Sequence, residues 1–222
     1  MGYLKYFYCE QCERYLTNKE ISNHLKEFHS HKIKEIFTDK KRVRLSKLLS
    51  IALRHQPKVL QIQLDNEGFT NLEKLINQIK KRNNFEWVNR KMINAIIELD
   101  NKGRFEINDN NIRARYGHSI PRIKINLKNS DLPEILYHGT NYNAYIKIEN
   151  EGIKPMGRNL VHLTSFIKDA KIVGSRHHGK LVLLEINVNK AINNGYQIWR
   201  AGKNVYVTNF IPKKYINMIK NE

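Results

Sequence analysis

The stretch Leu136-Tyr137-His138-Gly139-Thr140 (LYHGT) opens the last third of this 222-residue chain. Its apolar beginning predicts a buried strand, and its end predicts a tight turn that presents a histidine, a glycine and a hydroxyl. On both sides of this stretch, helical and strand-like patterns alternate along the sequence. Together these patterns place the chain in the α+β class.

The sequence that follows the LYHGT stretch has the pattern of a mixed lobe with short helices. Apolar runs mark the strands, and polar turn residues separate them. The expected elements are a helix at about 142–149 ended by Gly152, a strand at 161–163, a helix capped by Ser165, a central strand at 181–186, and edge strands near 197–199 and 205–208.

The sequence that precedes the LYHGT stretch predicts three helices and then a hairpin. In the first helix, from residue 43 to about His55, apolar residues recur at spacings of three and four, and Pro57 disfavours its continuation. This order is typical of a winged helix, a common nucleic-acid-binding lobe, and a boundary is expected near residues 128–131. The other expected elements are a helix from a capping box at Thr70 to about Lys80, a helix at about 90–99, and strands at 104–107 and 112–116.

The balance of charge points to a polyanionic partner. The chain has 39 Lys and Arg against 21 Asp and Glu, which gives a formal net charge of +18. Cations that neutralise phosphates release condensed counterions, and this release favours binding to nucleic acid. An AT-biased genome, which raises the lysine content everywhere, is the alternative explanation.

The sequence indicates an intracellular protein. No run of 18 apolar residues could span a membrane, and residues 1–12 lack the apolar core of a signal peptide. Two cysteines three residues apart are a poor disulfide framework. We therefore expect a reducing, cytoplasmic location and no membrane partner, with the oligomeric state open and a monomer favoured.

Four residues near the N-terminus have the spacing of a zinc finger. Cys9 and Cys12 are followed, after eleven residues, by His24 and then by His29 about one helical turn later. Two thiolates and two imidazoles suit tetrahedral zinc, and the metal would supply folding energy that so small a unit lacks. His31 could compete as a ligand, and unconnected surface residues are the alternative. Such a finger could bind RNA or brace the neighbouring lobe.

Cationic side chains in three separate stretches suggest a phosphate site. Arg54 and His55 end the first helix, Arg113 lies on a hairpin strand, and Arg176 begins a loop with two histidines. Each of these residues could also have a purely structural role, such as the favourable interaction of a cation with a helix C-terminus. If they converge, the planar guanidinium groups can bind phosphate oxygens, and His55 can exchange a proton near neutral pH.

Six motifs in this chain resemble those of the RNA (tRNA) 2′-phosphotransferase family. They occur in that family's order, cover roughly residues 43–216, and leave the zinc finger as an addition. In chain order they are LSKLLSIALRHQP (45–57), LDNEGF (64–69), IRARYGHSI (112–120), LYHGT (136–140), VHLT (161–164) and VGSRHHG (173–179).

The resemblance implies an NAD-dependent enzyme that removes an internal 2′-phosphate from RNA, typically at a tRNA splice junction. Its partner would be a tRNA-like RNA that carries this phosphate. The reaction would pass through an ADP-ribosylated RNA and release nicotinamide and ADP-ribose 1″,2″-cyclic phosphate. The implied domains are a zinc finger at 1–31, a basic connector at 32–42, a winged-helix RNA-binding lobe at 43–128 and an ADP-ribosyltransferase-like NAD-binding lobe at 129–222.

The resemblance also implies a role for each site residue. The arginines of the catalytic set would clamp the phosphate, and its histidine would exchange protons in the second step. Gly139 would let the backbone approach the dinucleotide closely. The implied catalytic residues are Arg54, His55, Arg113 and Arg176, and the implied NAD-binding residues are His138, Gly139, Thr140, His162 and Thr164.

Two departures from the family pattern affect this assignment. Thr164 replaces the more usual serine but keeps a hydroxyl. The loop at 175–179 has one histidine more than the common pattern, which leaves the placement of Arg176 and the roles of its two histidines open.

Two other functions stay open from the sequence. The first is an ADP-ribosyltransferase that uses NAD to cap nucleic-acid phosphate ends and stops after one step. The second is a zinc-finger nucleic-acid binder without catalysis. The intact set of catalytic arginines and His55 favours an enzyme that completes the second step, because these groups act on the phosphorus.

Overall fold

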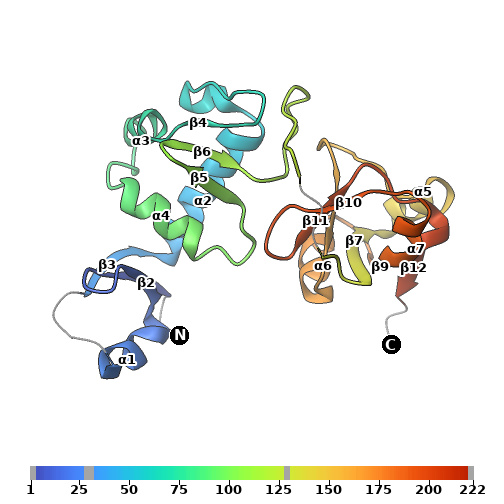
Figure 1. Ribbon diagram of the computed structural model, residues 1–222, viewed down its shortest axis with the longest axis horizontal. Helices are drawn as coiled ribbons and strands as arrows, with labels where there is room; N and C mark the ends of the chain where they lie inside the picture. The colour runs from blue at the N-terminus through green and yellow to red at the C-terminus, as the bar shows by residue number, and fades with distance from the viewer. Residues whose placement is uncertain (1–3, 28–32, 128–130, 220–222) are drawn as a thin grey trace. The chain divides into compact units, whose positions relative to one another are not determined.

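The computed structural model describes residues 4–27, 33–127 and 131–219 (Figure 1). It is a mixed structure of helices and antiparallel sheets, so the expected α+β class is confirmed. The chain divides into two compact units, each of which is described by itself. The first unit comprises residues 1–65, 69–100 and 105–113, and the second comprises 66–68, 101–104 and 114–222.

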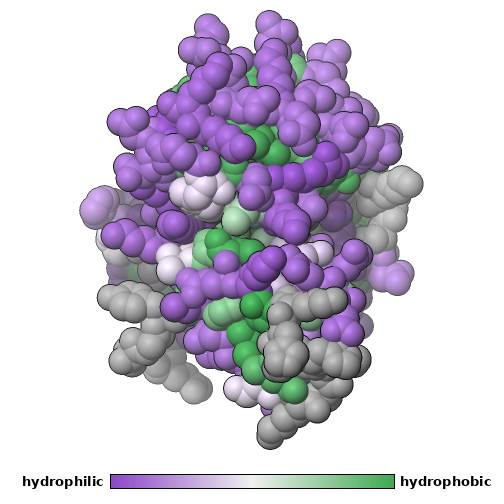
Figure 2. Space-filling model, turned by 90° about the vertical axis from the view of Figure 1, so that its left-hand side faces the viewer, coloured by the Kyte–Doolittle hydropathy of each residue, from purple (hydrophilic) through white to green (hydrophobic). Residues whose placement is uncertain are grey.

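One face of the molecule is mostly polar. Hydrophilic side chains dominate the face drawn in Figure 2, and apolar side chains show only in patches between them. Among the described helices, none has both the length and the apolar character needed to cross a lipid bilayer.

The first unit begins with a small sheet and one helix. Strands β1 (Lys5–Cys9), β2 (Arg14–Thr17) and β3 (Ile33–Thr38) form an antiparallel sheet in the order β2-β1-β3, and α1 is Asn18–Glu27. The basic connector expected at 32–42 is therefore largely a strand. Its one buried side chain is Phe37, which lies against the Tyr6 ring at a centroid distance of 5.3 Å.

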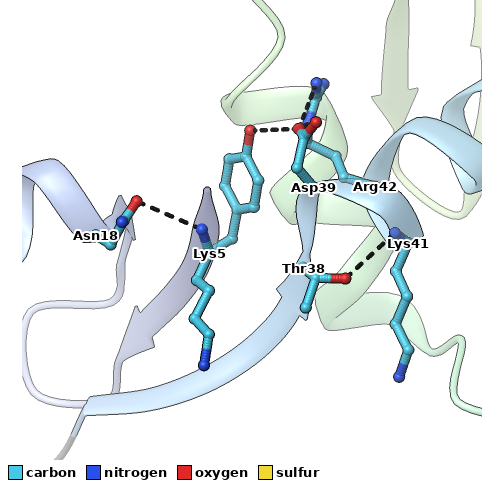
Figure 3. A network of polar contacts seen from close by, with 7 residues as sticks. Lys5, Asn18, Thr38, Asp39, Lys41 and Arg42 are labelled. Carbon is cyan, nitrogen blue, oxygen red and sulfur yellow. Dashed lines mark hydrogen bonds and ion pairs between the residues drawn. The ribbon is translucent and has the colours of Figure 1, made fainter. Parts of the chain in front are cut away.

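The helix that carries Arg54 begins earlier than the sequence predicts. Helix α2 (Asp39–Arg54) begins four residues before residue 43, because the Thr38 hydroxyl caps it by accepting a hydrogen bond from the Lys41 backbone N–H (Figure 3). It ends at Arg54, as expected from Pro57, and a 3₁₀ turn η2 (Pro57–Leu60) follows.

Two further helices and a second sheet complete the first unit. The helix expected from Thr70 begins later, because Asn71 provides the cap and Thr70 belongs to a strand instead. The three strands form a sheet in the order β4-β6-β5. The elements are β4 (Thr70–Asn71), α3 (Leu72–Lys80), α4 (Arg90–Glu98), β5 (Phe105–Asn108) and β6 (Asn111–Ala114).

The second unit is built on one six-stranded sheet. Its strands pair in the order β10-β11-β8-β7-β9-β12, and neighbouring strands are antiparallel. The strands are β7 (Ile135–Asn141), β8 (Val161–Thr164), β9 (Leu181–Asn187), β10 (Ile198–Arg200), β11 (Val205–Thr208) and β12 (Ile216–Ile219). The other elements are α5 (Tyr142–Glu151), α6 (Ile167–Gly174), α7 (Val188–Asn193) and a 3₁₀ turn η3 (Lys213–Tyr215).

The two faces of this sheet have different coverings. Helices α5 and α7 pack on one face, over a core that contains Leu136, Leu163 and Leu184. Helix α6 packs against β7 on the other face, where a smaller cluster around Tyr116 and Val207 also lies (Figure 1).

Several local expectations for the second unit are wrong. The His-Gly-Thr end of the LYHGT stretch is not a tight turn, because β7 runs through Asn141 and pairs with β9 over its whole length. Ser165 does not cap α6, which begins after Phe166 without a side-chain cap. Residues 114–127 pack with this second unit, and α7 and β12 are additional elements.

Candidate active site and metal centre

Three of the four predicted zinc ligands lie together in the first unit. The sulfur atoms of Cys9 and Cys12 and a ring nitrogen of His24 all lie within 4.8 Å of one another. Cys12 Sγ and His24 Nε2 are 3.6 Å apart. Zinc–sulfur and zinc–nitrogen bonds at a tetrahedral angle put these two atoms roughly 3.6 Å apart, so the cluster fits zinc. His29 and His31 lie outside the described residues.

The thiol groups of this cluster differ in acidity. A hydrogen bond from the Cys12 backbone and a second one involving His24 lower the pKa of Cys9 to about 6. Burial raises the pKa of Cys12. A cysteine that is a thiolate near neutral pH is a ready metal ligand.

The sheet that carries Cys9 packs on the helix that follows it. The Tyr6 hydroxyl donates to the Asp39 carboxylate over 3.2 Å, and Arg42 donates to the same oxygen over 2.9 Å (Figure 3). The Arg42 guanidinium also lies over the Tyr6 ring, 5.4 Å from its centroid. Strand β1 is thereby held against the start of α2.

A second contact joins the same sheet to α4. The Lys91 ammonium lies 5.0 Å from the centre of the Tyr8 ring. Burial and the nearby charge of Glu98 raise the pKa of Tyr15 to about 12, and Asn94 forms a hydrogen bond with it. Of the two roles that the sequence leaves open for the finger, these contacts favour bracing of the neighbouring helices.

Arg54 and His55 lie at the C-terminal end of α2, as predicted. Arg54 is 8% exposed, and its guanidinium lies over the Phe105 ring, 5.7 Å from the centroid. His55 is exposed and its backbone N–H donates to the Ile51 carbonyl, which closes the helix. The first cation is therefore fixed by packing, while His55 is exposed.

Arg113 is held on β6 by two contacts. Its Nε donates to the Glu106 carboxylate over 2.6 Å, and its guanidinium lies 4.3 Å from the centre of the Phe69 ring. The Asp65 carboxylate accepts a hydrogen bond from the Phe69 N–H, which fixes the turn that presents this ring. Two residues of the LDNEGF motif, Asp65 and Phe69, thus help to hold the Arg113 guanidinium in place.

The predicted site residues divide between the two units. Arg54, His55 and Arg113 belong to the first unit, and Arg176 belongs to the second together with every predicted NAD-binding residue. The convergence of the three arginines on one phosphate stays a prediction.

His138 has a defined tautomer on β7. Strands β7 and β8 share the pair Tyr137 with Thr164, and one residue further on His138 Nδ1 lies 3.0 Å from the His162 carbonyl oxygen. A carbonyl can only accept, so Nδ1 carries the proton and Nε2 is left as an acceptor. Burial lowers the pKa of His138, and the charge of His177 lowers it further against the hydrogen bond to His162. The imidazole is therefore neutral near pH 7.

Gly139 is required by helix packing. A Cβ on this residue would overlap the carbonyl oxygen of Ala170 and lie 2.7 Å from its carbon. Gly174 at the end of α6 allows the same close approach from the other side. This contact alone explains glycine at 139, and the predicted approach of a dinucleotide stays a prediction.

The three remaining predicted NAD-binding residues occupy strands of the same sheet. Thr140 is buried on β7, opposite Val182. Thr164 ends β8, where its hydroxyl accepts a hydrogen bond from the Phe166 N–H. The ring of His162 lies near that of Tyr116, with 5.9 Å between the centroids.

A cavity of about 660 Å³ opens on the His162 face of the sheet. Trp199, Val207 and His162 are in register on three adjacent strands and line its floor. The segment at 115–127 forms the other wall, and Asn159 fastens it by donating to the carbonyls of Ile120 and Ile123. The cavity combines aromatic rings with polar groups, as nucleotide sites do.

Arg158 was not among the residues predicted from the sequence. The residue is exposed overall, but surrounding atoms partly desolvate its guanidinium and lower its pKa; Tyr116 opposes this effect and the positive charge of Arg176 adds to it. The positive charges of Arg158 and Arg176 repel each other, so an anion bound beside them would be stabilised. Its position in the sequence could have indicated it, because Arg158 lies three residues before the VHLT motif.

Comparison with known proteins identifies a single family. The model described as RNA 2′-phosphotransferase, Tpt1 / KptA family, matches residues 40–210. A probable RNA 2′-phosphotransferase from Pyrococcus horikoshii is 41% identical over 178 residues, which are 80% of this chain and 99% of that relative. One from Fusobacterium nucleatum is 36% identical over 176 residues, 78% and 97% of the two chains. The match begins after the Cys9, Cys12 and His24 cluster.

Proposed function

Because the chain belongs to the RNA 2′-phosphotransferase, Tpt1 / KptA family, we propose that it is an enzyme that removes a 2′-phosphate from RNA with NAD as the acceptor. The observation that carries this proposal is the extent of the match. Residues 40–210 include every predicted catalytic and NAD-binding residue and reach into both compact units.

The two units suit the two substrates. Helices α2, α3 and α4 followed by the β5–β6 hairpin have the order of a winged helix, and we assign RNA to this unit. The six-stranded sheet of the second unit is the proposed ADP-ribosyltransferase-like lobe that binds NAD. The cavity beside His162 lies within the usual range of ligand sites, roughly 300–1,000 Å³. Of the five predicted NAD-binding residues only His162 lines it, so it is the proposed place for one part of NAD, and the ribose would lie nearer His138.

In the first step, an oxygen of the RNA 2′-phosphate attacks the anomeric carbon of the nicotinamide ribose, and the bond from that carbon to nicotinamide breaks. The phosphate is already an anion, so the attack needs no general base. Arg54, Arg113 and Arg176 would hold its other oxygens through their planar guanidinium groups. His138 Nε2 would accept a hydrogen bond from a ribose hydroxyl, which its neutral tautomer allows.

In the second step, the 2″-hydroxyl of the ribose attacks the phosphorus, and the bond from phosphorus to the RNA 2′ oxygen breaks. One proton leaves the attacking hydroxyl, and one must reach the departing oxygen. His55 would carry out both transfers, because an imidazole both accepts and donates near neutral pH. The products are RNA with a free 2′-hydroxyl and ADP-ribose 1″,2″-cyclic phosphate.

Incubation with an oligonucleotide that carries one internal 2′-phosphate, together with NAD, tests this function. We expect mass spectrometry to find dephosphorylated RNA, nicotinamide and the cyclic phosphate in equal amounts. The same oligonucleotide without the phosphate is the control and should consume no NAD. A stable ADP-ribosylated RNA as the sole product would point to a transferase that stops after one step, and no NAD consumption would refute the proposal.

The N-terminal cluster is the proposed structural zinc site, with His29 as the fourth ligand. In support of this, three side chains from β1, the turn after it and α1 have ligand atoms within 4.8 Å of one another. When bound, zinc would cross-link these elements, and apparent binding energies of about 10 kcal/mol or more make such a link decisive for a small unit. The metal would thereby fix the sheet that packs on α2 and α4.

Replacing Cys12 with serine is expected to remove one zinc ion per chain and to unfold the N-terminal sheet. Elemental analysis measures the zinc. Trp87 reports the unfolding, because its ring lies 6.2 Å from that of Phe37 on β3, and a Trp199→Phe background isolates its fluorescence.

The matched control for Cys12→Ser is Asn23→Ala, an exposed position next to a ligand on α1, which should keep both zinc and fluorescence. Comparing His29→Ala with His31→Ala identifies the fourth ligand. Full zinc occupancy in Cys12→Ser, or none in the unsubstituted protein, would contradict the proposed site.

A further inference from the structure

One face of α2 carries a line of exposed basic side chains. Lys40, Arg44 and Lys47 are spaced by four and three residues and are all exposed. Ile51, 43% exposed, and then His55 continue the same face at spacings of four. Residues at these spacings share one side of a helix, so the line leads along α2 to the proposed catalytic pair.

Aromatic rings hold two cations at the start of this helix. The Arg44 guanidinium lies 4.7 Å from the centre of the Phe85 ring, and its Nη2 donates to the Asn83 carbonyl over 3.5 Å. The Lys41 ammonium lies 5.1 Å from the centre of the Trp87 ring. In Figure 3 the Lys41 side chain points away from Asp39 and Arg42. A cation over a ring is positioned without being neutralised, so its charge stays available to an anion.

Other cations of the same unit are neutralised by carboxylates. The ion pairs join Lys5 to Glu35, Lys34 to Glu10, Arg42 to Asp39 and Arg90 to Glu73. Within the described part of the chain, no ion pair joins Lys40, Lys41, Arg44 or Lys47 to a carboxylate. These four cations of α2 therefore keep their charge at its exposed surface.

We propose that this face of α2 is a track for the single-stranded RNA that flanks the 2′-phosphate. Lys40, Arg44 and Lys47 bind successive backbone phosphates, and Ile51 contacts a base or ribose next to the catalytic pair. The proposal rests on the proposed function only in identifying the polyanion as substrate RNA.

The length of the track sets the length of RNA that it can bind. From Lys40 to His55 the helix rises about 22 Å, at about 1.5 Å per residue. An extended strand with roughly 6 Å between phosphates places three or four nucleotides on this length. A dinucleotide substrate therefore reaches His55 without using the track, whereas a decamer uses it fully.

The test compares Lys40→Gln/Arg44→Gln/Lys47→Gln with the unsubstituted protein. We expect this triple variant to bind a decamer RNA roughly tenfold more weakly than the unsubstituted protein at low salt. Because each lost phosphate contact removes about 0.7 from the salt slope for single strands, the slope of log affinity against log salt should fall by about 2. Turnover of a 2′-phosphorylated dinucleotide should stay at the level of the unsubstituted protein.

The matched control removes the same charge elsewhere, in Lys147→Gln/Lys190→Gln/Lys213→Gln on exposed sites of the second unit. It should keep both affinity and salt slope. Lys40→Gln/Lys47→Gln leaves the Arg44 contact with Phe85 intact and should show about two thirds of the slope change, which excludes misfolding as the cause.

Equal losses in the control and the track variant, or an unchanged salt slope in the track variant, would overturn the proposal. Binding to RNA without a 2′-phosphate is measured separately from turnover. Failure of the enzymatic assay would thus refute the proposed function, while the binding comparison would still test whether this face of α2 binds RNA.

Discussion

The His55→Ala variant is expected to bind 2′-phosphorylated RNA normally but to release dephosphorylated RNA about 10²–10⁴-fold more slowly. This range is the usual contribution of a general acid–base group. His55 is exposed at the end of α2, and its backbone N–H, which closes the helix, is kept in alanine. Since the first step needs no base, the ADP-ribosylated RNA should accumulate. Rapid-quench mass spectrometry of the RNA measures both species.

The control for this prediction is Gln56→Ala, an exposed neighbour outside the proposed machinery. It should turn over at the rate of the unsubstituted protein. If His55→Ala also turns over at that rate, His55 has no part in proton transfer. If NAD is consumed slowly and no intermediate builds up, His55 acts in the first step instead.

The periodic parts of the fold could be predicted from the sequence because burial imposes their period. Leucines at spacings of three and four define α2, and its inward side chains, such as Leu45, Leu49 and Leu53, are fully buried. A strand at Val205–Thr208 is confirmed as β11, but it is not the expected edge strand, because it pairs with β10 on one side and β8 on the other. All four of its residues are buried, so a short run of β-branched and aromatic residues indicated it, and not one buried face.

The errors occur where long-range pairing overrides local sequence. Gly139 and Thr140 resemble turn residues, yet they extend β7 because the apolar strand β9 supplies a partner for each. Residues 33–38 are charged enough to resemble a connector, yet they pair with β1. Local patterns contain no information about a partner strand that lies tens of residues away.

The proposed reactive groups of the candidate site can be picked out in the sequence, but the side chains that hold them in place cannot. Motif residues such as Arg54 and Arg113 stand out by chemical type and spacing. Phe105 and Phe69, which lie under their guanidinium groups, look like ordinary core residues in the sequence. Arg158 belongs to no quoted motif, and only the fold brings it close enough to Arg176 for their charges to interact.

Gly139→Ala is expected to destabilise the second unit by about 3 kcal/mol, the upper end of the usual cost of overpacking. The added methyl group would meet backbone atoms of Ala170 and lie 3.0 Å from the Gly174 nitrogen, and backbone cannot rotate away as a side chain can. Helix α6 must therefore shift away from β7. For a protein of this size, about 3 kcal/mol corresponds to a fall in Tm of roughly 6–12 °C, which calorimetry measures.

The matched control is Gly157→Ala, because a Cβ there has no atom within 4 Å and its Tm should stay within about 2 °C. Because the predicted NAD-binding residues His138 and Thr140 flank Gly139 on β7, NAD affinity should fall together with the stability of Gly139→Ala. The two readouts separate the two reasons for a glycine at this position. Weaker NAD binding with an unchanged Tm would show that close approach of the dinucleotide, and not helix packing, is what requires it.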